Sequence, residues 1–250
     1  MKTTGNTILI TGGASGIGLA LAERFLSRGN QVIICGRRPD KLQQAKERLP
    51  ALHIRVADIA VEADRLALCD WVSSEFPDLN VLINNAGIQQ RVNLLDATAA
   101  WSHYREELLI NQEAPIHLTM LLIPHLRQKQ AAAIVNVTSG LAFVPAGWVP
   151  IYSATKAAMH SFTVSLRLQL AETPIEIIEI IPPAVNTDLG GVGLHTFGEP
   201  LDQFADAMFA GLDQGEAEIG YGFSKKAMHA SRAEQDEIVK ANWERMKDHK

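Results

Sequence analysis

Tyr152 and Lys156 lie four residues apart in the run Tyr-Ser-Ala-Thr-Lys, and on a helix this spacing places both side chains on one face. A free phenol has a pKa of about 10, and a neighbouring ammonium group lowers it. Lowering it to about 7 requires about 4 kcal/mol of differential stabilisation. Ser139 could donate a hydrogen bond to the same substrate oxygen. The three residues together predict acid/base chemistry, although a Tyr and a Lys at this spacing are also common on helix surfaces.

A glycine-rich run from Thr11 to Gly18, with the spacing Gly-x3-Gly-x-Gly, follows a short apolar run and precedes a helical pattern. Glycine lets the backbone turn tightly and approach a pyrophosphate, and the start of a helix presents free N–H groups. Glycines also mark any tight strand-to-helix turn. The strand before and the helix after favour dinucleotide binding.

Gly36, Arg37 and Arg38 follow the second apolar run, where the adenosine ribose of a dinucleotide would lie. An acidic residue there would hold the 2′-hydroxyl of NAD, whereas guanidinium groups suit the 2′-phosphate of NADP. The sequence therefore favours NADP and leaves NAD possible, because both arginines could simply be solvated at a strand end.

Short apolar runs alternate with longer helical patterns along the chain, which is typical of a parallel sheet with crossover helices. Runs that are almost entirely apolar indicate strands buried on both faces. We therefore expect an α/β fold, a Rossmann-type doubly wound parallel sheet of about seven strands with helices on both faces. The expected strands are residues 7–11, 31–35, 53–56, 81–84, 134–138 and 175–181, with a weaker seventh near 218–220.

No repeat or linker divides the chain, so residues 1–250 are expected to form one dinucleotide-binding domain. From about 187 to 215 the helical period weakens and glycines accumulate, which favours a segment that covers the substrate. The tail from 230 to 250 is polar and helix-prone, and either packs on a neighbouring subunit or frays.

The composition excludes several classes of protein. With 47% hydrophobic residues and a net charge of −5, the chain is neither disordered nor equipped with a basic surface for nucleic acid. It shows neither a signal peptide nor an apolar run of the roughly 20 residues that span a bilayer, so we expect no membrane contact and a cytoplasmic location. Its two cysteines are expected to be buried. The histidines show no metal-ligand spacing, and no metal is predicted.

The motifs occur in an order and spacing that resembles the short-chain dehydrogenase/reductase family, in its compact form of about 250 residues. The resemblance runs from about residue 7 to 187, and the details Cys-Gly-Arg-Arg and Pro-Pro-Ala-Val are most similar to the subgroup called DltE-like, a label that identifies no substrate. The motifs that carry it are the turn 11–18, Asp58, the run 84–87, Asn111, Ser139 and the Tyr152/Lys156 pair.

The resemblance implies a role for each member of this set. Tyr152 is expected to be the general acid/base, and Lys156 to lower the Tyr152 pKa and bind the nicotinamide ribose. Ser139 would orient the substrate oxygen, and Asn111 would hold a water that links Lys156 to solvent. Asp58 would accept a hydrogen bond from adenine. The implied cofactor residues are Gly12, Ser15, Gly16, Ile17, Gly18, Arg37, Arg38, Asp58, Ile59, Asn85, Ala86, Gly87, Tyr152, Lys156, Val185 and Thr187.

One position departs from the family pattern. The family carries Pro-Gly after the sixth strand, where this chain has Pro182 and Pro183. Proline has no backbone N–H, so a backbone contact to the nicotinamide would be missing at that position. Thr187 still matches a residue that in the family bonds the carboxamide.

These observations lead to an expected function. We expect an oxidoreductase that transfers a hydride between NADP(H), or NAD(H), and a small-molecule carbonyl or secondary-alcohol substrate. A non-catalytic NAD(P)-binding regulator and an epimerase or dehydratase on the same fold remain alternatives. The family resemblance further implies a homodimer or homotetramer.

Overall fold

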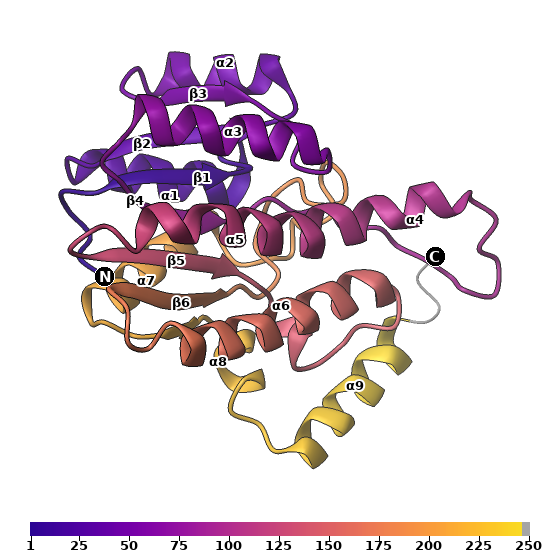
Figure 1. Cartoon of the computed structure of the whole chain (residues 1–250). Coiled ribbons are helices and arrows are strands. Elements are labelled where there is room, and N and C mark those ends of the chain that lie inside the picture. Colours follow the sequence, from indigo (N-terminus) through magenta and orange to yellow (C-terminus); the bar gives the residue numbers. More distant parts are fainter. Residues whose placement is uncertain (247–250) are drawn as a thin grey trace.

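The apolar runs form a single parallel sheet. The computed structural model describes residues 1–246, and in this part of the chain seven strands pair in the order β3-β2-β1-β4-β5-β6-β7 (Figure 1). This confirms the predicted doubly wound sheet. The strands are β1 (Thr7–Thr11), β2 (Gln31–Gly36), β3 (His53–Val56), β4 (Leu79–Asn84), β5 (Ala132–Val137), β6 (Ile175–Ile181) and β7 (Glu218–Gly220).

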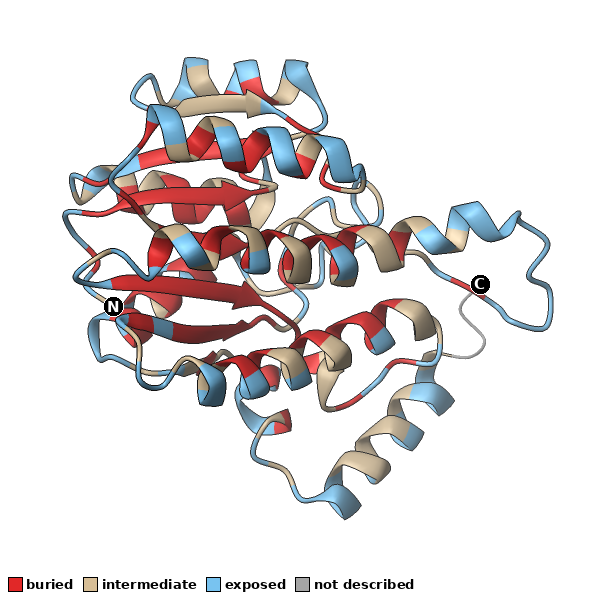
Figure 2. Ribbon diagram, in the orientation of Figure 1, coloured by how far each residue is buried: buried red, intermediate tan, exposed pale blue. Residues whose placement is uncertain are grey.

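Helices cover both faces of the sheet, so the central strands are almost entirely buried (Figure 2). One core cluster packs α1 (Gly16–Ser27), α2 (Pro39–Arg48) and α7 (Leu201–Asp213) against the sheet. The other packs α3 (Glu62–Glu75), α5 (Ala114–Leu126) and α6 (Pro150–Gln169) against the opposite side. Both cysteines, Cys35 and Cys69, are free thiols and lie buried in the second cluster, as expected.

The strand order reverses between β1 and β4. The chain runs outward from β1 through β2 to β3, and then returns to place β4 on the other side of β1. A crevice forms at such a switch point, beyond the carboxyl ends of the strands, and dinucleotides bind there in folds of this type. In Figure 1 the arrowheads of the central strands point toward the side where the start of α6 (Pro150–Gln169) also lies.

The helices differ from the expected pattern in two places. The helical pattern expected over 99–128 is α4 (Trp101–Leu108), followed by a π-helical turn at Leu109–Glu113 and then α5. The segment from about 187 to 215, where the helical period weakens, contains α7, whose Phe204 and Met208 are fully buried against the sheet. That helix was not predicted, because the glycines before it dominate the local composition.

Two shorter elements complete the fold. The short helix α8 (Phe223–Ala227) follows β7, and α9 (Arg232–Met246) has no buried residue and lies apart from the sheet in Figure 1. The expected helical tail thus forms over 232–246, and its remainder lies outside the described residues. Within residues 1–246, no helix combines the length and apolar character needed to span a membrane.

Candidate active site

A cleft of about 1200 Å³ opens at the carboxyl ends of the strands. The residues around it come from segments far apart in the sequence, which the switch point brings together. Gly18 and Asn111 are the two sequence-predicted residues outside its lining. The predicted residues that line it are Gly12, Ser15, Gly16, Ile17, Arg37, Arg38, Asp58, Ile59, Asn85, Ala86, Gly87, Ser139, Tyr152, Lys156, Val185 and Thr187.

The glycine-rich turn packs closely against the loop after β4. Gly12 has a φ of +65°, and a Cβ there would lie 2.8 Å from the Cα of Ala86. A Cβ on Gly18 would lie 2.4 Å from the side-chain nitrogen of Asn85, so Gly18 lies beneath the turn. Ser15 precedes α1 without capping it through its side chain. The turn therefore keeps backbone and hydroxyl donors available at the cleft, and its glycines cannot be replaced without displacing the neighbouring loop.

Two arginines form the wall near the end of β2. The guanidinium group of Arg37 pairs with Glu106 of α4, and Arg38 Nη2 lies 3.5 Å from Ser15 Oγ. The Arg37 side chain is 46% exposed. Arg38 therefore lies beside the start of α1, where an anionic group would meet donors from both sides, whereas Arg37 lines the same cleft with its guanidinium group paired to Glu106.

Ser139, Tyr152 and Lys156 meet at the other end of the cleft. Ser139 follows β5, and its side chain hydrogen-bonds the buried Tyr152 hydroxyl. Lys156 lies one turn further along α6, with its Nζ 5.5 Å from the centre of the Tyr152 ring and 2.8 Å from the carbonyl oxygen of Val137. The geometry thus brings together the three groups that the sequence singled out.

Burial controls the proton affinities of this pair. It raises the pKa of Tyr152, against the lowering effect of the Ser139 hydrogen bond, and the nearby charge of Glu107 raises it further. Burial lowers the pKa of Lys156 to about 8, which the charge of Glu107 opposes. We expected a lowered Tyr152 pKa from the sequence. The structure shows the opposite direction, because desolvation of the phenolate outweighs the lowering effect of the Ser139 hydrogen bond.

Asn111 lies behind the cleft in the π-helical turn. Its Oδ1 accepts a hydrogen bond from the backbone N–H of Ile88 at 2.9 Å, and its Nδ2 donates to Ile88 O at 2.8 Å. Nδ2 also lies 3.3 Å from Thr155 Oγ1. A Cβ on Gly87 would lie 3.3 Å from Asn111 Oδ1 and 3.8 Å from Lys156 Nζ. Asn111 therefore fixes the loop after β4 close to the lysine.

The sequence analysis missed Glu107 on α4. Its side chain is fully buried, and its Oε1 accepts a hydrogen bond from the backbone N–H of Gln90 at 3.1 Å. Burial raises its pKa to about 7, whereas the Gln90 N–H and the charge of Lys156 oppose the rise. Its position beside Glu106 in a polar helix gave no signal in the sequence.

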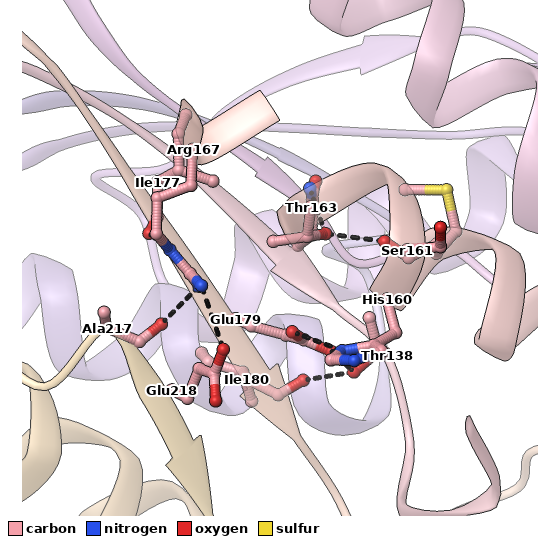
Figure 3. Close-up of polar contacts among 12 residues, drawn as sticks. Thr138, His160, Ser161, Thr163, Arg167, Ile177, Glu179, Ile180, Ala217 and Glu218 are labelled. Carbon is pink, nitrogen blue, oxygen red and sulfur yellow. Dashed lines mark hydrogen bonds and ion pairs between the residues drawn. The ribbon is translucent and has the colours of Figure 1, made fainter. Parts of the chain in front are cut away.

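A second missed group lies beside Thr138, the residue that precedes Ser139 (Figure 3). The carboxylate of Glu179, on β6, accepts a hydrogen bond from Thr138 Oγ1 at 2.6 Å and lies 3.0 Å from Nδ1 of His160. This contact raises the pKa of His160. A signal did exist in the sequence, because Glu179 lies between two pairs of isoleucines in a strand whose other acidic residue, the exposed Glu176, is nearer its start.

The apolar wall near Tyr152 comes from two loops. Leu189 and Trp148 pack with Tyr152, Ala146 and Val149 in a small cluster. The segment after β6 returns on itself at a bridge that pairs residue 185 with residue 199. These contacts place part of the predicted covering segment directly over the tyrosine.

Helix α9 also contributes to the cleft, which the sequence did not predict. Asn242 and Arg245 line it, and a Cβ on Gly147 would lie 2.6 Å from the ring of Trp243. The contact between Gly147 and Trp243 joins this otherwise exposed helix to the loop that precedes α6.

Among the described residues, no group of three or more His, Cys, Asp or Glu is arranged to hold a metal ion.

Comparison with known proteins gives consistent results. A family model described as short chain dehydrogenase matches residues 6–192. The chain is 44% identical over 243 residues to a Bacillus subtilis (strain 168) protein named as an uncharacterized oxidoreductase, DltE, with 95% of this chain and 96% of that protein covered.

Two solved structures share the fold over most of the chain. A short-chain dehydrogenase from Sphingobium yanoikuyae in complex with NADPH has a TM-score of 0.80 at 29% identity, over 98% of this chain and 96% of that one. A 3-ketoacyl-(acyl-carrier-protein) reductase from Brucella melitensis complexed with NADH also has a TM-score of 0.80, at 27% identity over 89% of this chain and 100% of that one.

Proposed function

The chain is an enzyme of the short-chain dehydrogenase family, and we propose that it interconverts a carbonyl group and a secondary alcohol with a nicotinamide dinucleotide. The observation that carries this proposal is the meeting of Ser139, Tyr152 and Lys156 at one end of a cleft whose other end is the glycine-rich turn. One end supplies a proton donor and acceptor, and the other supplies donors for phosphate groups.

The residues of the cleft fit such a cofactor. The turn around Gly12 lies against Ala86 and leaves no room for a side chain at Gly12, so a pyrophosphate there would meet backbone N–H groups and the Ser15 hydroxyl. Similar proteins have been solved with NADPH and with NADH, which supports a nicotinamide dinucleotide. Arg37 and Arg38 favour the 2′-phosphate of NADP, because guanidinium groups bind phosphate in a bidentate manner. Asp58 and Thr187 would hold the adenine and the carboxamide.

The bound nicotinamide would supply or accept the hydride. Ser139 would donate a hydrogen bond to the substrate oxygen, and the Tyr152 hydroxyl would give its proton to that oxygen during reduction. In the oxidation the Tyr152 phenolate would take up the proton of the substrate hydroxyl. The raised pKa of Tyr152 means that the phenol is protonated at neutral pH, which is the state from which it would donate in the reduction. Lys156, with its Nζ fixed by Val137 O, would bring positive charge to the phenolate that remains.

The cofactor assignment is tested by titrating the protein with NADPH and NADH and following nicotinamide fluorescence. We expect tighter binding of NADPH, and Arg37→Ala should weaken it about tenfold or more through loss of a charge-assisted contact worth about 1.5–3 kcal/mol. Arg232→Ala, on exposed helix α9, is the matched control and should bind as the wild type does. Equal binding of the two cofactors would contradict the NADP preference.

Catalysis is tested with Tyr152→Phe and a panel of carbonyl compounds. The variant should bind cofactor normally and lose most of the turnover, because only the phenolic proton is removed. If the wild type and Tyr152→Phe both bind the cofactor and neither converts any compound, the result would support a non-catalytic regulator instead. Turnover without net change of the nicotinamide redox state would support an epimerase or dehydratase.

We also infer a homo-oligomer. Trp101, Met120 and Leu168 are 64%, 63% and 77% exposed on α4, α5 and α6. Burial of such side chains against a second copy would stabilise an assembly. Light scattering that gives a 27.3 kDa species would exclude it.

A further inference from the structure

Glu107 and Asn111 together fasten one short segment to the helix that carries them. Asn111 binds both backbone groups of Ile88, and Glu107 Oε1 accepts from the N–H of Gln90. The segment follows directly on Asn85–Gly87, which lines the cleft. Helix α4 packs against α6, the helix of Tyr152 and Lys156. Glu107 is therefore part of the wall directly behind the acid/base groups.

The second oxygen of this carboxyl group is the unusual feature. Oε2 of Glu107 is buried and has no hydrogen-bond partner among the described residues. A buried polar atom without a partner is costly, and removing a carboxylate from water costs several kcal/mol more. A leucine would fill a similar volume without either cost, so packing alone does not account for a glutamate here.

Charged groups around Glu107 come from one neighbouring helix. Lys156 and Tyr152, both on α6, are the ionisable groups whose charges interact with it. The segment that includes Gln90 contributes a backbone N–H to Glu107, and the next residue, Arg91, carries a charge that acts on His195. On its own helix, Glu106 is partly exposed and paired with Arg37. Within residues 1–246, Lys156 of the proposed acid/base pair is a cation whose charge lowers the pKa of Glu107.

We propose that Glu107 is a positioning residue that supplies the buried counter-charge for Lys156 and thereby governs proton transfer by Tyr152. This inference rests on the proposed function, since it assigns Glu107 a part in that reaction. Glu107 acts through Lys156 and does not touch the substrate. Its negative charge keeps Lys156 protonated in a buried position and makes the Tyr152 proton harder to remove.

The pairing is tested first without any substrate. In protein labelled with ¹³C at the glutamate side-chain carboxyl groups, one resonance should titrate near pH 7, well above the exposed glutamates, and should be missing in Glu107→Gln. Lys156→Gln should move that titration to higher pH, because the opposing cation is gone. Glu113→Gln, a partly exposed carboxylate on the next turn of the helix, is the control and should leave it unchanged. A Glu107 that titrates with the exposed glutamates, or is insensitive to Lys156→Gln, would overturn the proposal.

The consequence for the reaction is tested by the pH profile of kcat. Glu107→Gln retains the acceptor for Gln90 and removes the charge, so deprotonation of both Tyr152 and Lys156 becomes easier. The alkaline limb of the profile for carbonyl reduction should therefore move down by about 1 pH unit, with KM little changed. A profile that coincides with the wild type, with normal circular dichroism, would overturn the proposal. Absence of any turnover in the wild type would instead refute the proposed function, and the carboxyl titration would still decide whether Glu107 and Lys156 are paired.

Discussion

Glu179 and Glu107 are the two acidic residues that are fully buried within residues 1–246, and both lie close to α6. Their surroundings differ. Glu179 accepts a hydrogen bond from Thr138, and both of its oxygens lie within 3.1 Å of Nδ1 of His160 (Figure 3). Glu107 accepts one backbone hydrogen bond, and its other oxygen is unpartnered. The contacts of Glu179 offset the free-energy cost of burying its charge and stabilise the fold. The charge of Glu107 is offset by fewer contacts, so it destabilises the fold when present, and it interacts with the charge of Lys156.

The largest expected effect is on the pH dependence of stability at Glu107. Its pKa is raised from 4.5 to about 7 in the folded protein, which corresponds to about 3 kcal/mol at 1.36 kcal/mol per pH unit. The folded state holds this proton more tightly, so its stabilising contribution is complete below about pH 4.5 and is lost as the pH rises to about 7. Urea unfolding at a series of pH values should show this loss in the wild type and not in Glu107→Gln. If the free energy of unfolding changed with pH in the same way in the two proteins, the charge of Glu107 would not be destabilising, and Glu107 would not differ from Glu179 in this respect.

Removal of Glu179 should destabilise the protein at neutral pH. In Glu179→Ala, the Thr138 hydroxyl and the His160 ring lose their acceptor, and we expect the free energy of unfolding to fall by about 2 kcal/mol. Glu176→Ala, an exposed residue on the same strand that pairs with the terminal amino group, should change it by less than about 0.5 kcal/mol. Similar unfolding midpoints for Glu179→Ala and the wild type would show that the contacts of Glu179 do not stabilise the fold.

A smaller effect is expected at the partner of Glu179. The pKa of His160 is raised, chiefly by its hydrogen bond to Glu179, so its stabilising contribution is present below the unfolded pKa and is lost as the pH rises through the folded one. The free energy of unfolding of His160→Gln should therefore differ from that of the wild type at weakly acidic pH and approach it at alkaline pH. Burial lowers the pKa of His53, so His53→Gln should show the opposite trend. If the difference in stability from the wild type changed with pH in the same direction in both variants, this interpretation of the two histidines would be wrong.

The central strands of the sheet were predictable because they bury both faces. The apolar run of β1 is buried at every position, and residues of that kind have no other stable location in a chain of this size. A weaker seventh strand was predicted near 218–220, and β7 lies there, although it is only three residues long and only its middle residue is buried. Helix α7 was missed because its buried face follows a glycine-rich stretch whose composition indicates a loop.

The site was predictable where motifs place residues directly at strand ends and on the first turns of helices. Ser139, Tyr152 and Lys156 meet for that reason. The two carboxylates could not be assigned from the sequence in the same way. Glu106 and Glu107 are adjacent and identical, and only the packing of α4 against α6 determines which one is buried, since the π-helical turn after α4 interrupts the regular period. The pKa direction of Tyr152 was wrong for a related reason, because desolvation depends on tertiary burial.

The two thiols provide a chemical report on unfolding. Burial raises the pKa of both Cys35 and Cys69 to about 12, so neither is a nucleophile at neutral pH in the folded protein. Cys35 lies in β2 and Cys69 in α3, both in the first third of the chain. An alkylating reagent will therefore modify them only after that third has opened. The mass that the reagent adds in a brief exposure therefore reports the opening of the region around β2 and α3. It does not report the opening of β6, which carries Glu179.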